Sequence, residues 1–241
     1  MKHFNKVQLV LLVTASLGLA ACSDDNDNVV EVVTPAPAPA PTPVLSSYDV
    51  TVTNLTNAQP LSPIAVALHA EGQLWQIGAE ASEELEYLSE GGDNSFLLAN
   101  AAVVASASGM GIVAPGASET ISVSIEDNSE ALITIATMLV NTNDAFTGLN
   151  AHSLASLGVG ETMTRTTFVY DSGTEANTEA MGTIPGPADG GTGFDAMRDD
   201  AGFISMHPGV VGSDDGLSTS VLTQAHRFDN PAMRISITRT E

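Results

Sequence analysis

The sequence predicts an all-β fold, because strand-like alternation dominates the chain after residue 46. Apolar and polar residues alternate with a period of two, which is the pattern of a strand with one buried face. Hydrophobic residues make up 43% of the chain, which is enough for one domain with a substantial core. One or two short helices are expected in the connections between strands.

Four stretches show this alternation most clearly. Their apolar positions are Tyr48, Val50 and Val52; Ile64, Val66 and Leu68; Ile121, Val123 and Ile125; and Met233, Ile235 and Ile237. Residues 131–140 are almost all apolar, which predicts a central strand, and residues 162–170 predict a further strand. Residues 182–216 are rich in glycine, proline and aspartate and predict long surface loops.

One helix is predicted after Ser82, which suits an N-cap and is followed by acidic residues in the first turns. Leu85 and Leu88 would lie on its buried side, and the Gly91-Gly92 pair would end it. The alanine-rich segment 96–105 predicts a second short helix.

Acidic residues follow two of the predicted strands. Asp144 comes after the apolar run, and Asp171 and Glu175 come after residues 162–170. If the fold brings these carboxylates within about 5 Å of one another, each pair repels by roughly 3 kcal/mol at an effective dielectric near 20. Calcium takes six to eight oxygen ligands from irregular loops. The sequence therefore predicts a Ca²⁺ site formed by Asp144, Asp171 and Glu175.

The same segments carry a resemblance to a known family. Tyr170-Asp171-Ser172-Gly173-Thr174-Glu175-Ala176-Asn177 and Asn143-Asp144-Ala145-Phe146-Thr147-Gly148-Leu149 resemble two markers of the spondin N-terminal domain family. The resemblance covers roughly residues 48–240. It implies an antiparallel β-sandwich similar to a C2 domain, a calcium ion in loops at one end, and an adhesive role. The family more often has aspartate where Glu175 stands, and glutamate reaches about one methylene further.

The start of the chain indicates where the protein works. Residues 1–21 have the lysines and apolar run of a signal peptide, and Leu19-Ala20-Ala21-Cys22 resembles a bacterial lipobox. Cys22 is the only cysteine, so we expect it to be acylated and to anchor the protein. Residues 22–46 then read as an acidic and proline-rich tether, and 47–241 as the spondin-like domain. Ser23 favours the outer membrane, with the domain facing the periplasm or the cell surface.

Charge excludes several classes of partner. From Cys22 onward the chain has no lysine, and 29 acidic residues against five arginines give a formal charge of −24. Such acidity argues against binding nucleic acid or anionic lipid, so the lipid anchor would be the only membrane contact. The expected partner is an extracellular protein or glycan.

No enzyme motif is found in the sequence. The histidines have no zinc-type spacing, a Gly-x-Ser-x-Gly elbow is absent, and acylation would remove the only thiol. We therefore expect a binding protein and no catalytic residues. Two alternatives stay open, a secreted hydrolase that uses paired carboxylates and a purely structural envelope protein.

Overall fold

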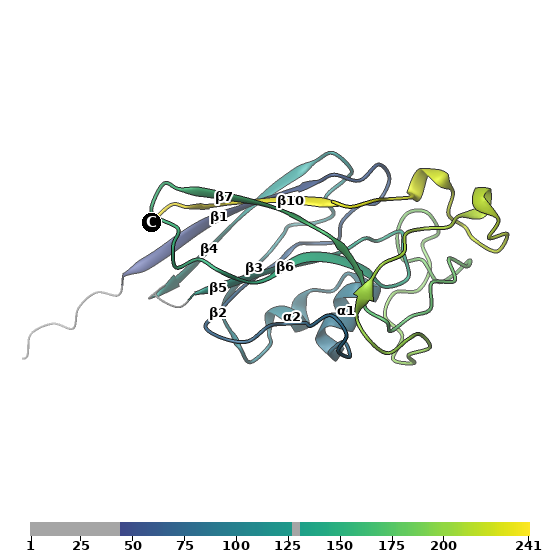
Figure 1. Cartoon of the computed structure of the whole chain (residues 1–241), viewed down its shortest axis with the longest axis horizontal. Helices are drawn as coiled ribbons and strands as arrows, with labels where there is room; N and C mark the ends of the chain where they lie inside the picture. The colour runs from purple at the N-terminus through teal and green to yellow at the C-terminus, as the bar shows by residue number, and fades with distance from the viewer. Residues whose placement is uncertain (1–43, 127–130) are drawn as a thin grey trace, which may run out of the picture. The chain divides into compact units, whose positions relative to one another are not determined.

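The computed structural model describes residues 44–126 and 131–241, so the predicted signal peptide, Cys22 and most of the tether lie outside the described residues. Two antiparallel sheets form the domain, and their facing sides enclose the main core. This arrangement confirms the prediction of an all-β antiparallel sandwich with two short helices (Figure 1). The first strand begins at Leu45, two residues before the predicted start of the domain.

The four-stranded sheet follows the sequence pattern closely. Its order is β4 (Ser118–Glu126), β1 (Leu45–Asn54), β10 (Met233–Arg239) and β7 (Thr162–Thr167). Along β1 the apolar residues Tyr48, Val50 and Val52 are fully buried, and the residues between them are partly exposed. The alternation predicted for this region is therefore observed, with one face in the core and one in solvent.

The six-stranded sheet is covered on both faces. Its order is β3 (Val103–Ser108), β2 (Ala65–His69), β5 (Leu132–Met138), β6 (Ala145–Ser153), β8 (Val169–Asp171) and β9 (Ser205–Met206). The helices α1 (Glu83–Gly91) and α2 (Ser95–Leu98) lie on the side away from the other sheet (Figure 1). Every residue of β2 is consequently buried, which corrects the prediction of a half-buried strand.

Helix α1 forms as predicted. The Ser82 hydroxyl accepts a hydrogen bond from the Leu85 backbone N–H at 3.3 Å, and Gly92 ends the helix with a left-handed φ of 70°. Leu85 and Leu88 are fully buried in a second core beneath the sheet. Burial of each leucine side chain stabilises the domain by about 1.5–3 kcal/mol.

The prediction of a second helix over residues 96–105 is only partly right. Helix α2 ends at Leu98, and residues from Val103 onward form β3. Pairing of β3 with β2 supplies the backbone hydrogen bonds that a longer helix would have made. Tertiary pairing therefore overrides the local preference of an alanine-rich segment.

The predicted strand 162–170 is two strands in different sheets. β7 pairs with β10, whereas β8 pairs with β6 in the other sheet, and the chain crosses between them at Phe168. β8 ends at Asp171, and long loops follow it. These loops contain the 3-10 turns η1 (Ser213–Asp215) and η2 (Gln224–His226) and gather at the end of the sandwich away from the C-terminus (Figure 1).

Candidate metal centre

Strand register brings Asp144 and Asp171 together. β6 begins at Ala145, directly after Asp144, and in the β6–β8 ladder Ala145 pairs with Asp171. The Ser172 backbone N–H extends this ladder by donating to the Asp144 carbonyl at 3.4 Å. Two aspartates that are 27 residues apart in the sequence therefore become neighbours at one sheet end.

A tight turn after β8 fixes the next residues. Asp171 Oδ1 accepts a hydrogen bond from the Gly173 N–H at 2.8 Å, and Gly173 has a φ of 71°. A Cβ at this position would lie 2.4 Å from the Phe203 carbonyl oxygen. Only glycine fits both the left-handed backbone and this close approach. The Asn177 side-chain amide donates to the other Asp171 oxygen at 2.6 Å.

The two oxygens of Asp144 differ sharply. Oδ2 accepts hydrogen bonds from the Ser172 hydroxyl at 2.8 Å, the Thr174 N–H at 2.9 Å and the Glu175 N–H at 3.2 Å. Oδ1 is buried and has no hydrogen-bond partner, although the residue is 0% exposed. A buried carboxylate oxygen without a donor costs free energy unless a proton or a cation reaches it.

A third carboxylate, Asp200, comes from the loop between β8 and β9. This loop runs beside the turn after β8, because the Asp199 N–H donates to the Thr174 carbonyl at 3.1 Å and the Gly202 N–H donates to the Gly173 carbonyl at 2.9 Å. Asp200 is thereby placed opposite the two buried aspartates, while its own side chain remains exposed.

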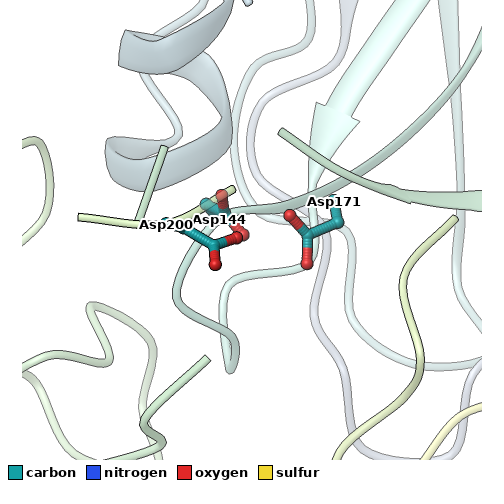
Figure 2. Close-up of side chains that lie close together, drawn as sticks. All are labelled: Asp144, Asp171 and Asp200. Carbon is teal, nitrogen blue, oxygen red and sulfur yellow. The ribbon is translucent and has the colours of Figure 1, made fainter. Parts of the chain in front are cut away.

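One oxygen from each of Asp144, Asp171 and Asp200 lies within 4.8 Å of the others. Figure 2 shows the three carboxylates lying close together. Calcium–oxygen distances are about 2.3–2.6 Å, so a span of this size admits a calcium ion between the three groups. Carboxylate oxygens are also the hard ligands that calcium prefers.

Electrostatics disfavours three bare charges here. Burial raises the pKa of Asp144 to about 7, and the neighbouring charge of Asp171 adds to the rise. Burial also raises the pKa of Asp200 above its usual range, and Asp171 again contributes. Without a cation the cluster holds protons into the neutral range, and a bound divalent ion would replace them.

Glu175 lies beside this group but is not one of the three. Its backbone N–H donates to Asp144, and its carboxylate accepts a hydrogen bond from the Asn143 side-chain amide at 2.9 Å. Burial raises the pKa of Glu175 to about 7, despite that hydrogen bond. The structure therefore brings together two of the three predicted ligands, Asp144 and Asp171. Glu175 lies beside them, but its carboxylate is not one of the three in the group.

Sequence reasoning missed Asp200. It belongs to the loop-rich stretch 182–216, in which aspartates are common, and no strand pattern singles it out. The Arg198-Asp199-Asp200 segment was the available signal, since it places the only arginine between Glu175 and Gly216 next to two acids.

The nearby arginine is directed away from the three aspartates. Arg198 forms ion pairs with Glu80 at 2.8 Å and with Glu86 at 2.5 Å, and it also donates to the Ala81 carbonyl. These contacts tie the 194–200 loop to α1, and among the described residues Arg198 forms no ion pair with Asp144, Asp171 or Asp200.

Comparisons with known proteins do not assign this chain to a family. No protein-family model matches the chain, and no curated protein matches it. The likeness to spondin N-terminal domains therefore stays a prediction from short motifs. Among the helices in residues 44–126 and 131–241, none has the length and hydropathy needed to cross a bilayer.

Proposed function

We propose that this protein binds a calcium ion at the loop end of its sandwich, through Asp144, Asp171 and Asp200. The observation that carries the proposal is the unpartnered Oδ1 of Asp144, which belongs to a fully buried carboxylate with an oxygen within 4.8 Å of oxygens of Asp171 and Asp200. A divalent cation would satisfy that oxygen and cancel the repulsion within the group.

Metal binding suits these residues better than catalysis does. A carboxyl with a displaced pKa next to a second carboxylate also occurs in hydrolases. Asp144 is 0% exposed, however, and Asp171 is 4% exposed, so a substrate bond would have to enter the protein interior to meet them. A small ion would need access only from the solvent-exposed side of the group, where Asp200 lies.

We further propose that the domain is the binding module of a lipoprotein anchored in the outer membrane. The lipobox-like residues before Cys22 and the proline-rich tether support this role, and so does the resemblance to adhesive spondin domains. The metal would stiffen the loops that present the binding surface to an extracellular protein or glycan. Exported calcium modules bind with Kd values of about 0.1–1 mM, so environmental calcium would set occupancy.

A thermal melt with calcium and with chelator tests the metal site. At about 10 mM calcium, a Kd in that range stabilises the fold by roughly 1.4–2.7 kcal/mol, which is several degrees in Tm. Asp171→Asn should abolish the shift. Asp49→Asn is the matched control, because Asp49 lies on the outer face of the four-stranded sheet and should leave the shift intact. A wild-type Tm that calcium does not move would refute the proposal.

Anchoring has a separate test. Cys22→Ser should move the protein from the membrane fraction to the soluble fraction of cells that export it, because the acyl chains supply its membrane affinity. Lipid labelling of the wild-type protein should be lost in the same variant. Retention of the serine variant in the membrane would contradict lipidation.

A further inference from the structure

Two residues outside the group of three aspartates, Asn177 and His207, are linked by hydrogen bonds to Asp171. The Asn177 side-chain amide donates to Asp171 Oδ2 at 2.6 Å, and the Asn177 side-chain oxygen lies 3.0 Å from His207 Nε2. Asp171 ends β8, Asn177 lies in the loop after it, and His207 directly follows β9. One chain of hydrogen bonds therefore joins three segments and ends on a proposed metal ligand.

The chemistry of the three side chains fixes which atoms donate along this chain. An ionised carboxylate only accepts hydrogen bonds, so the NH₂ group of Asn177 faces Asp171 and its oxygen faces His207. The imidazole proton is consequently on Nε2, while Nδ1 accepts a hydrogen bond from the Gly209 backbone N–H at 2.9 Å. Burial lowers the pKa of His207 to about 4, which keeps this neutral form at neutral pH. Both ring nitrogens are engaged, so His207 supports the site without binding the cation.

The sheet holds His207 in place, and Asn177 depends on His207. The His207 backbone N–H donates to the Val169 carbonyl at 3.1 Å, which continues the pairing of β8 with β9 by one residue. Its ring packs against Phe228 with centroids 5.3 Å apart, and the residue is 8% exposed. Asn177 lies in a loop and is only partly buried. Its side chain has several rotamers to choose from, and the hydrogen bond to His207 selects one.

We propose that Asn177 and His207 are positioning residues that fix the Asp171 carboxylate for the cation. This inference rests on the proposed function, because it assigns a role to the residues that support the same centre. Asp171 Oδ1 accepts a hydrogen bond from the Gly173 N–H, and Oδ2 accepts one from Asn177. With a donor on each oxygen, the carboxylate cannot rotate without losing a hydrogen bond. Each oxygen keeps a second lone pair that a cation can use.

Calcium affinity, measured by titration calorimetry, tests this role. His207→Phe keeps a ring that packs against Phe228 but cannot donate to Asn177, so the Kd for calcium should rise by about 10-fold. Asn177→Leu has a similar shape, removes the donor to Asp171 and should weaken binding at least as much. His207→Gln has an amide that can still donate to Asn177. Its affinity should therefore lie closer to that of the wild type than the affinity of His207→Phe does.

A double variant separates positioning from a general loosening of the loops. If His207 acts through Asn177, the protein with both His207→Phe and Asn177→Leu should bind calcium as Asn177→Leu alone does. His226→Phe is the matched control. His226 is another histidine in the loops, and its Nδ1 accepts a hydrogen bond from the Thr223 N–H at 3.0 Å, so its replacement should leave the Kd unchanged. Circular dichroism and the Tm in chelator report the folding and stability of each variant.

The outcomes distinguish this inference from the proposed function. If the wild type binds calcium and Asn177→Leu binds it equally well, the positioning role is overturned and the site of three aspartates stands, even where His207→Phe does not fold. A double variant that loses affinity by the product of the two single losses would show that His207 does not act through Asn177. Equal losses in His226→Phe and His207→Phe would reduce the effect to loosened loops and overturn the inference. A wild-type protein that binds no calcium overturns both proposals.

Discussion

Polar side chains are exposed and hydrogen-bonded on the outer face of the four-stranded sheet, whereas at the loop end of the six-stranded sheet several are buried and lack partners. On the outer face, hydroxyl groups pair across neighbouring strands, as in Thr51 with Thr120 at 2.8 Å and Thr164 with Ser236 at 3.1 Å. Asp49 there accepts a hydrogen bond from Ser122 at 2.6 Å. These groups are also open to water, so the protein and its solvent satisfy them completely.

At the loop end, carboxylates are buried against one another. Asp144 and Glu90 each retain an oxygen without a donor, and the pKa of Asp144 is raised to about 7 by burial. Acidic side chains on a solvated face need no special ligand, whereas acidic side chains in the interior do. The comparison teaches that overall acidity does not locate a site here, and that the burial of particular carboxylates is the observation that supports the proposed one.

The largest expected effect that separates the two regions is that of Asp144→Asn. Asparagine is neutral, so in chelator it should remove the repulsion and raise stability by about 1–3 kcal/mol, or roughly 2–10 °C in a domain of this size. It should also abolish the response to calcium. Thermal melts with and without chelator measure both effects. A variant that is less stable than the wild type in chelator would show that the buried charge is already satisfied.

An intermediate effect is expected from pH. Burial raises the pKa values of Asp144 and Glu175 to about 7 in the folded state, above their usual values of 3.8 and 4.5. Between those values the folded protein binds protons that the unfolded chain does not, so stability in chelator should increase as pH falls from 8 toward 5. Calcium should stabilise more at pH 8 than at pH 5, since protons compete with it.

His207 changes the pH dependence of stability in the opposite direction. Burial lowers its pKa to about 4, so the unfolded chain binds a proton first and stability falls as pH drops below about 6.5. His207 is unchanged in Asp144→Asn. The difference in Tm between the wild type and this variant at each pH therefore reports on the carboxyl group of Asp144 and not on His207. A difference that does not change with pH would contradict the assigned role of Asp144.

The smallest effect is expected on the outer face. Thr51→Ala removes one cross-strand hydroxyl pair, which should cost about 0.2–1 kcal/mol and leave the calcium response unchanged. Urea denaturation with and without calcium measures both quantities. A change in the calcium-dependent shift would mean that the two regions are coupled. The contrast between the outer face and the loop end would then be wrong.

Local pattern predicted most of the strands but not the whole site. Alternation in β1, β4 and β10 was sufficient, because each strand buries one face. The crossing at Phe168 could not be predicted, since it depends on which sheet each half of the segment joins. The cover that α2 gives to β2, and α1 to β5 and β6, is likewise a tertiary effect.

Within the site, sequence reasoning located Asp144 and Asp171 because each lies next to a strand, where register fixes its position. Asp200 is held by contacts of a long loop with the turn after β8, and such contacts leave no periodic signal. The orphaned oxygen of Glu90 was hidden for a related reason. In the sequence it is one of several acids on a predicted helix, and only packing shows that it faces inward.

A crystal structure at near pH 8 with about 10 mM calcium tests the central claim most directly. The proposal predicts electron density for an ion with one oxygen each from Asp144, Asp171 and Asp200 at about 2.3–2.6 Å. Well-ordered loops with no ion between these three carboxylates would contradict it.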